Sequence, residues 1–564
     1  MKKYPYDPFR RTESIFSEDE NAEILIDSPD PWELYSFTSG RFVENEEHEL
    51  AQRYRSFDIL ELARRAARAV QADSCLRIEK FPDGFYNRIL LLTLGNGKEV
   101  VAKIPNPNAG RPHFTTASEV ATMKFAREVL GTNLPRVLDW SSRAQDTTVG
   151  AEFILMERLD GAHLEDVWPE MKIEDRNEVV KAVAAYQKSW ASVTFEQYGS
   201  LYFAEDYKGQ NAPALVYTDE NGRRVEDPRF VIGPSTSREM FDYGRGDIEF
   251  DRGPWKSLEE YHAAIGHREL ACVQHLPNLH PSSLTLRGPG LYQPTREEKV
   301  AAIETYLKLL KYALPADRSL GSSHLWHNSL HAGNILVDLE NPGRIVGIID
   351  WQSTELSPLY FRSHQPPFMR HAGPQLHGLD HPVWPPGYDD LKGDAKRAAD
   401  ALFWDQTLCS MYRALVHHRI PKLFKCFEFQ ESTSYSLLNT ALRLSVDGEA
   451  LHLAVVCELE KEWETLPGTQ GIPFPLSLTA TDREKIHEDA MSVAVGIEAM
   501  HRIKSRLGEH FPEKGFVLHD EHEMVIDALS QATKEVLSEV EEIREELDLL
   551  DAQDCQTDSL RRSG

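Results

Sequence analysis

Residues 325–352 read LWHNSLHAGNILVDLENPGRIVGIIDWQ. Two short apolar runs, Ile335–Val337 and Ile345–Ile349, flank a turn-rich stretch that contains Asn, Pro and Gly. This pattern predicts a β-hairpin. A polar cluster precedes the first run and Asp350 follows the second, so the hairpin would bring Asn334 close to Asp350. Side-chain oxygens of these two kinds suit a hard cation such as Mg²⁺.

Bulk composition limits the classes of partner. The chain has 564 residues, which predicts two to four structural units. The net charge of -28 argues against nucleic acid and anionic membranes as partners, because the overall field repels phosphate. No apolar run approaches the roughly 20 residues of a membrane span. The six cysteines form no C-x-x-C pair, which argues against zinc and a disulfide framework and favours reduced thiols inside the cell.

A β-rich segment with one helix lies upstream of the hairpin. A turn at Pro82–Arg88 separates its first two strands and could lie over a ligand, and GNGK at 95–98 predicts a tight hairpin turn. Lys103 lies on the third strand and Glu119 on the helix. In chain order the pattern predicts strands at 76–81, 89–94 and 99–104, a helix at 116–130, and strands near 135–140 and 151–157.

Lys103 and Glu119 form the pair that gives this segment a chemical interpretation. A lysine on a strand can neutralise nucleotide phosphates, and a glutamate on a neighbouring helix can hold that lysine in place. Taken singly, such a lysine is more often an edge residue and such a glutamate a solvated charge near a helix start. Their order in the chain, with the hairpin downstream, favours the functional interpretation of both.

The rest of the chain is mainly helical. Helices are predicted at 57–71, 258–273, 297–313, 394–465 and 482–508. Residues 203–256 are rich in Gly, Asp and Arg and predict an insertion built of loops. A final apolar stripe from Leu529 to Leu547 predicts either a coiled-coil seam or a helix packed on its own chain, and its short length favours the second.

The hairpin segment resembles the aminoglycoside phosphotransferase/phosphotransferase-enzyme family, in which H-x-D-L-H-x-G-N precedes a hairpin ending in I-D-W. Similarity to the fungal branch called altered inheritance of mitochondria protein nine extends over WELYSFTSGRF (32–42), TASEVAT (116–122), VGAEFILME (149–157) and GIIDWQ (347–352). The resemblance implies an α+β, two-lobed protein-kinase-like fold. It implies a mitochondrial location, with the cytoplasm as the alternative, because the N-terminus is acidic.

The resemblance also implies a domain order. Residues 1–70 would be a partly disordered N-terminal extension, and 71–160 a small nucleotide-binding lobe. Residues 161–365 would be the large lobe, with an insertion near 203–256, and 366–564 a helical C-terminal extension packed on it. The insertion and the 357–386 loop would line the acceptor pocket.

Site residues are carried over position by position. Lys103 and Glu119 resemble the phosphate lysine and its partner, and the turn with Gly84 and Asn87 resembles the nucleotide-covering loop, although it departs from G-x-G-x-x-G. The remaining matches are the hinge at Glu157 to Leu159, the metal ligands Asn334 and Asp350, and the structural histidine His327. ATP and Mg²⁺ are the implied cofactors, with an unknown small-molecule acceptor or protein partner.

Ser329 stands where the family has its catalytic aspartate. A serine hydroxyl has no useful basicity near neutral pH, and a general base contributes roughly 10²–10⁴-fold. A kinase rate of roughly 1–100 s⁻¹ would then fall to about 10⁻⁴–1 s⁻¹. Three hypotheses follow: an ATP-Mg-binding protein with weak or no transfer and a regulatory role, an active small-molecule kinase with a substitute base, or a structural protein with no ligand. Whether the chain is an enzyme stays open at this point.

Overall fold

The computed structural model describes residues 25–27, 31–207, 212–288 and 291–562. Residues 1–24 and 28–30 of the N-terminal extension, which is expected to be partly disordered, lie outside the described residues. Between these two ranges the structure describes one short strand, β1 (Leu25–Asp27), which pairs in parallel with β3 (Cys75–Lys80).

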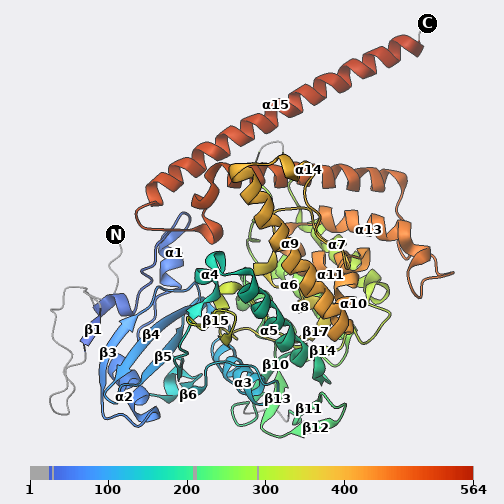
Figure 1. The fold of residues 1–564 in the computed structure, drawn as a ribbon. Helices are drawn as coiled ribbons and strands as arrows, with labels where there is room; N and C mark the ends of the chain where they lie inside the picture. The colour runs from blue at the N-terminus through green and yellow to red at the C-terminus, as the bar shows by residue number, and fades with distance from the viewer. Residues whose placement is uncertain (1–24, 28–30, 208–211, 289–290, 563–564) are drawn as a thin grey trace.

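The N-terminal part is a six-stranded sheet in the order β1-β3-β4-β5-β7-β6 (Figure 1). Asp58 caps α2 (Ile59–Ala69) by accepting from the Glu61 amide, and this helix packs on one face of the sheet. α3 (Phe114–Glu128) has its buried side chains in the other, larger core. The remaining strands are β4 (Asn87–Leu94), β5 (Glu99–Pro105), β6 (Val137–Ser141) and β7 (Phe153–Glu157).

The alternation of β5 decides where its lysine points. Val100, Ala102 and Ile104 are fully buried in the core under α2. Successive side chains on a strand point to opposite faces, so Val101 and Lys103 face the other side, toward α3. The apolar positions of one strand thus place a charged residue between the two lobes.

The second part is mainly helical, with short strands at its boundary with the sheet. The predicted hairpin is confirmed, because β15 (Ile335–Val337) and β16 (Ile345–Ile348) pair antiparallel, with β8 (Ala162–His163) at the edge. The predicted α+β class with a β-rich small lobe and a mostly helical large lobe is likewise confirmed. The main helices are α5 (Ile173–Ser192), α6 (Leu258–His275), α7 (Arg296–Ala313), α9 (Gly393–Arg419), α10 (Pro421–Gln430), α11 (Thr433–Thr440) and α13 (Ala450–Glu462).

Residues 203–256 contain more regular structure than their composition predicts. Three strands of four residues each, β11 (Leu215–Thr218), β12 (Arg224–Asp227) and β13 (Phe230–Gly233), interrupt the expected loops. β13 pairs with β10 (Ser200–Phe203), which lies against α3. The strands are too short for a periodic signal, which is why the sequence pattern does not reveal them.

The C-terminal stripe packs on its own chain, as predicted. α14 (Ala480–Leu507) crosses the large lobe, and α15 (His522–Arg562) runs along it before extending away (Figure 1). Leu529, Ala532, Val536 and Val540 join Ile503 and Leu507 in one apolar cluster. The positions further along this stripe fall outside the residues whose side chains are described.

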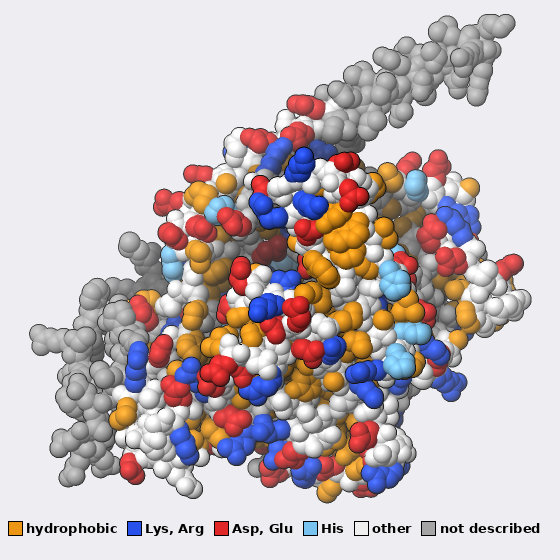
Figure 2. All heavy atoms as spheres, viewed as in Figure 1, with side chains coloured by type: hydrophobic (Ala, Val, Ile, Leu, Met, Phe, Trp, Pro, Cys, Tyr) orange, Lys and Arg blue, Asp and Glu red, His pale blue; other side chains and the backbone are white. Residues whose placement is uncertain are grey.

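The surface and the helices give two further facts. On the face shown in Figure 2, Lys and Arg side chains are scattered among Asp and Glu side chains, in keeping with the net charge of -28. Among the residues that the structure describes, none of the helices combines the length and the apolar character that a bilayer crossing requires.

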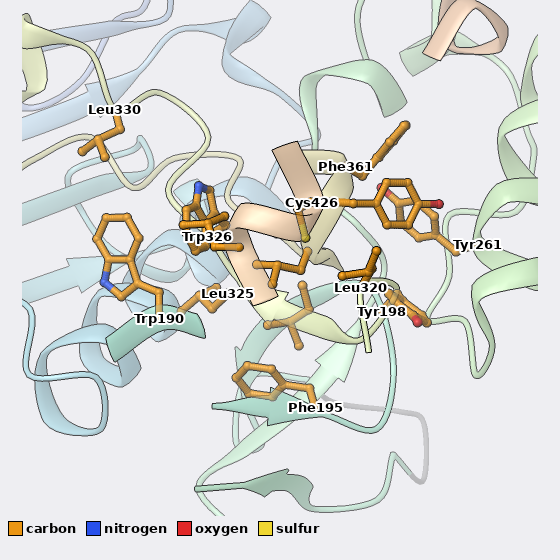
Figure 3. Packing of buried hydrophobic residues seen from close by; sticks show 14 of the residues in the cluster. Trp190, Phe195, Tyr198, Tyr261, Leu320, Leu325, Trp326, Leu330, Phe361 and Cys426 are labelled. Atoms are coloured by element: carbon orange, nitrogen blue, oxygen red, sulfur yellow. The ribbon is translucent and has the colours of Figure 1, made fainter. Parts of the chain in front are cut away.

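Trp190 is part of the large-lobe core and lies beside Leu325 and Trp326 (Figure 3). Its indole is fully buried, and its Nε1 donates a hydrogen bond of 2.9 Å to Thr132 Oγ1. Trp326 and Trp351 meet its ring edge to face at 5.5 and 5.7 Å. This aromatic cluster supports the polar loop that begins at His327.

Replacing Trp190 with Ala should destabilise the protein by about 3–5 kcal/mol, because the change leaves a large cavity and an unpaired Thr132 hydroxyl. The midpoint of thermal unfolding measures the loss. Trp404→Ala is the matched control, since Trp404 is 45% exposed. Equal midpoints for the two variants would contradict the placement of Trp190.

Candidate active site

Lys103 lies at the junction of three separate chain segments. Its Nζ is 2.7 Å from Glu119 Oε1 on α3 and 2.9 Å from Asp350 Oδ1 just after β16. Lys103 and Glu119 are 5% and 3% exposed, whereas 43% of the Asp350 side chain is accessible. The strand, the helix and the hairpin therefore converge on one ammonium group, and only the Asp350 side faces outward.

The charges of this cluster influence one another. Burial disfavours the Lys103 ammonium, but the Asp350 and Glu119 carboxylates outweigh burial and raise its pKa. Burial raises the pKa of Glu119, and the negative charge of Asp350 adds to this effect against the pull of Lys103. Burial also opposes ionisation of Asp350, yet Lys103 holds the pKa of that carboxyl below its usual value. Lys103 and Asp350 are both charged at neutral pH.

Asp350 has an unusual backbone conformation, with φ of 61°. Asp tolerates this left-handed region better than most residues, at a cost of order 1–3 kcal/mol for strain of this kind. The neighbouring Trp351 is buried, and its Nε1 donates to Ile348 O at 3.0 Å. The buried Trp351 ring thus fixes the turn to the core, while the Asp350 carboxylate points toward Lys103.

His327 positions the polar loop from within the core. Its Nε2 lies 3.0 Å from Ile349 O, and the Ser329 amide lies 3.2 Å from its Nδ1. Burial lowers the pKa of His327 to about 4, so the ring is neutral at pH 7. A neutral ring that donates through Nε2 and accepts through Nδ1 satisfies both contacts. His327 therefore ties the loop to the end of β16 next to Asp350.

Asn334 lies on the same loop, and its side-chain nitrogen, Nδ2, is hydrogen-bonded while its side-chain oxygen, Oδ1, is available to a ligand. Its Nδ2 donates to Ser329 O at 2.9 Å and lies 3.2 Å from His331 Nε2, and its backbone oxygen accepts from the Ile349 amide. Within the described parts of the chain, no hydrogen bond is recorded for Oδ1. An amide oxygen and the outward-facing Asp350 carboxylate are donors that a hard cation accepts.

The turn over the site is held by its own charges. The Gly84 amide donates to Asn87 O at 3.2 Å, which closes a tight turn. Asp83 is buried and lies 2.6 Å from Lys80 Nζ and 3.3 Å from Arg88 Nε. These are contacts that the sequence analysis did not predict, although three charges within nine residues of an apolar hairpin are a signal for them.

Asn87 is hydrogen-bonded to the segment that follows Asp350. Its Nδ2 donates to Gln352 Oε1 at 2.7 Å, and Gln352 Nε2 lies 3.3 Å from Asn87 Oδ1. Gln352 follows Asp350 by two residues, so this amide pair joins the turn to the segment that carries the acidic group. Gln352 was not predicted as a site residue, since a single glutamine carries no spacing signal.

The two hinge positions differ in where their side chains lie. Glu157 ends β7, and its carboxylate lies 3.7 and 3.6 Å from Arg127 and Arg136, directed away from the Lys103 cluster. Leu159 lies against Gly347 of the hairpin, where a Cβ would come within 2.2 Å of Leu159 Cδ1. Glycine at 347 therefore allows the linker to pass close over the hairpin, and only the backbone of Glu157 could serve a ligand.

The match to known families covers both lobes. The sequence model of the phosphotransferase enzyme family matches residues 77–361, from β3 to α8 (Leu359–Arg362). The chain belongs to the phosphotransferase enzyme family. Lys103, Glu119, Asn334 and Asp350 all lie within the matched range.

Several relatives are similar over much of this phosphotransferase-family chain. A subtelomeric hrmA-associated cluster protein of Aspergillus fumigatus is 31% identical over 59% of this chain and 68% of its own length. The mitochondrial altered inheritance of mitochondria protein 9 of Yarrowia lipolytica is 25% identical over 81% of each chain. Among solved structures, ADP-bound aminoglycoside phosphotransferase APH(2'')-Ib is 11% identical, covers 78% of this chain and 99% of its own, and has a TM-score of 0.32.

Ser329 lies five residues before Asn334, and Asp338 directly follows β15. Ser329 is exposed. The Asp338 carboxylate accepts from the Glu340 and Asn341 amides and pairs with Arg344, so Asp338 is a turn residue. These contacts commit the Asp338 carboxylate to the turn between β15 and β16.

Lys103→Met should cost about 3–5 kcal/mol at pH 8, because it leaves the buried Glu119 carboxylate unpaired. The unpaired group would have a folded pKa above its unfolded value of about 4.3, so the penalty grows as the pH rises above that value. Thermal unfolding at pH 5 and pH 8 should show the larger loss at pH 8.

Two further variants define the result. Adding Glu119→Gln to Lys103→Met should recover most of the loss, since it removes the stranded charge. Lys124→Met is the matched control, because the Lys124–Glu128 pair is exposed and worth at most about 1 kcal/mol. If Lys103→Met were as stable as the wild type at pH 8, the ion cluster would not contribute as described.

Proposed function

We propose that this protein binds ATP with Mg²⁺ between its two lobes and that its phosphoryl transfer is weak or absent, with a regulatory role. The proposal depends on one observation, the contact of Lys103 with both Glu119 and Asp350. A buried lysine held by a helix glutamate and facing an accessible carboxylate matches what polyphosphate and cation binding require. An N-terminal sheet and a hairpin converge there from distant parts of the chain.

The donor set fits the proposed ligand. Lys103 would neutralise the phosphates. Asn334 Oδ1 and the Asp350 carboxylate would hold the cation, because both are oxygen ligands of the kind that Mg²⁺ prefers. Bound Mg²⁺ would supply charge neutralisation on the phosphate oxygens. Glu119 would keep Lys103 in place, and the backbone at Glu157 to Leu159 would meet the base. Gly84 and Asn87 would cover the phosphates.

Ser329 is the reason to separate binding from turnover. Its hydroxyl cannot accept a proton from a substrate hydroxyl as a carboxylate does, so the general-base contribution of roughly 10²–10⁴-fold is lost. Positioning and electrostatic stabilisation supply most of phosphoryl transfer and depend on the Lys103 cluster instead. The intact cluster thus supports nucleotide binding more strongly than it supports catalysis.

An active small-molecule kinase with a substitute base is the second candidate. The same cluster favours it, because all the groups that would position MgATP are in place. The acceptor would be a hydroxyl-bearing small molecule bound near Ser329. A structural protein without ligand is the third, and it would require the buried Lys103–Glu119 pair to have only a structural role.

Relatives named as mitochondrial support a mitochondrial location for this chain.

MgATP should raise the thermal unfolding midpoint of the wild type, because a ligand present at 100 times its Kd stabilises by about 2.7 kcal/mol. The Lys103→Met/Glu119→Gln double variant lacks the phosphate-binding ammonium and should show little or no shift. An unchanged midpoint for the wild type at millimolar MgATP would contradict the proposal and favour the structural alternative.

Ser329→Asp should increase ATP hydrolysis by roughly 10²–10⁴-fold over a low wild-type rate, since it restores a general base. Steady-state release of phosphate measures this rate. Ser319→Asp is the control, because Ser319 is also exposed and lies outside the loop. Rapid transfer by the wild type to an added hydroxyl acceptor would exclude the inactive form of the proposal and favour the kinase.

A further inference from the structure

The tip of the turn over the site, Phe85 and Tyr86, is half-buried although it lies at a lobe edge. Two segments from elsewhere in the chain cover it. One is the stretch before α15, here called the C-terminal strap (residues 511–521). The other is the 3₁₀ turn Arg238–Met240 of the insertion. Neither belongs to the sheet that carries the turn.

The C-terminal strap adds a strand to the N-terminal extension. β18 (Phe516–Val517) pairs antiparallel with β2 (Arg41–Phe42), and the Val43 amide donates to Gly515 O at 2.9 Å. The approach is close, because a Cβ on Gly40 would lie 2.2 Å from Val517 O. In Figure 1 this red segment lies beside the blue segment that leads to α1 (Glu46–Ala51).

The strap then contacts the turn through side chains. The Phe516 ring lies 5.6 Å from Phe85, edge to face, and 6.0 and 6.1 Å from Phe37 and Phe42. Lys514 Nζ lies 4.9 Å from the centre of the Phe85 ring. Edge-to-face aromatic pairs of this kind stabilise a contact beyond the area that they bury. Phe516 is therefore the main contact between the strap and the turn.

The N-terminal extension is also hydrogen-bonded to Asp83, near the start of the turn. The Thr38 amide donates to Asp83 Oδ2 at 2.8 Å, and His519 Nε2 lies 3.0 Å from Thr38 O. The strap and the N-terminal extension thus contact each other, and both contact the turn. Movement of the turn away from the site would break the Thr38–Asp83 hydrogen bond and the contact of Phe85 with Phe516.

The strap is anchored to the large lobe, because its Val517 lies in one apolar cluster with Leu286 of the large lobe and Ile503 of α14. Helix α14 is itself bound to the large lobe. Leu286 donates its amide to Gly496 O on α14 at 2.9 Å, and Lys485 of α14 pairs with Glu298 of α7. Arg238 adds an independent contact, since its guanidinium lies 3.8 Å from the centre of the Tyr86 ring and donates to Asn108 O at 2.7 Å. The strap therefore contacts the large lobe through this apolar cluster and the small-lobe turn through Phe516.

We propose that the C-terminal strap is a positioning element that holds the nucleotide-covering turn closed, so that nucleotide enters and leaves only when the strap lifts. This inference rests on the proposed ATP binding. The turn has a single glycine and is already ordered by the strap, so binding requires little further ordering of it. Binding and release are then both limited by opening, as for a lid. Phe516 and Arg238 position the turn without touching the nucleotide.

Hydrogen exchange of the free protein tests the strap without any nucleotide. Phe516→Ala should increase exchange at the amides of residues 83–88 about tenfold, which corresponds to about 1.4 kcal/mol in the opening equilibrium. Leu518→Ala is the matched control, because Leu518 lies on the same strap and is 50% exposed. Exchange in Phe516→Ala equal to that of the wild type would overturn the proposal.

A crosslink provides the opposite perturbation and does not remove Phe516. Arg41 and Val517 are partners in the β2–β18 register, and antiparallel partners lie within disulfide range. The Arg41→Cys/Val517→Cys protein, once oxidised, should exchange more slowly at 83–88 than the same protein after reduction. Equal exchange in the two redox states would overturn the proposal even if Phe516→Ala fails to fold.

Nucleotide kinetics separate this inference from the proposed function. In stopped-flow experiments with a fluorescent ATP analogue, Phe516→Ala should release the analogue about tenfold faster than Leu518→Ala, and the oxidised crosslink should slow both binding and release. Unchanged rates with altered exchange would overturn the gating role. Absence of binding in every variant, with exchange altered as expected, would overturn ATP binding and leave the strap's hold on the turn supported.

Discussion

The contact of Lys103 with Glu119 and Asp350 is the interaction on which the arrangement of the two lobes depends. It joins a strand, a helix and the end of a hairpin that are far apart in the sequence. Because Lys103 and Glu119 are almost wholly buried, each would be costly without the other. The accessible Asp350 is the part of the cluster that an incoming ligand can reach. Structure and proposed function therefore rely on the same three charges.

Local patterns in the sequence predict much of this arrangement. The hairpin, the strand with Lys103 and the helix with Glu119 form as expected, because alternation, turn residues and helical spacing are strong at these places. The order of the elements, together with the resemblance, also predicts that Lys103 and Glu119 are close. The contact of Lys103 with Asp350 is harder to predict from the sequence, because it depends on how the two lobes pack on each other and not on a local hydrophobic period.

Features built from short or distant segments could not be predicted. The four-residue strands of the insertion carry no measurable period. The pairing of β2 with β18 joins Arg41 to Val517 and Phe42 to Phe516, from opposite ends of the chain. Asn87 and Gln352 meet only because the turn is folded over the site. Glu157 shows the reverse case, since its resemblance to a hinge residue says nothing about its side chain, which pairs with two surface arginines.

Equilibrium binding of ATP with and without magnesium, in the wild type and in Asp350→Asn, tests the central claim most directly. The account predicts that the wild type binds ATP at least about tenfold more tightly with Mg²⁺ than without it, a difference of about 1.4 kcal/mol. Asp350→Asn should lose that dependence, because the amide cannot neutralise the cation. Magnesium-dependent binding that is unchanged in Asp350→Asn, or no ATP binding by the wild type, would contradict the account.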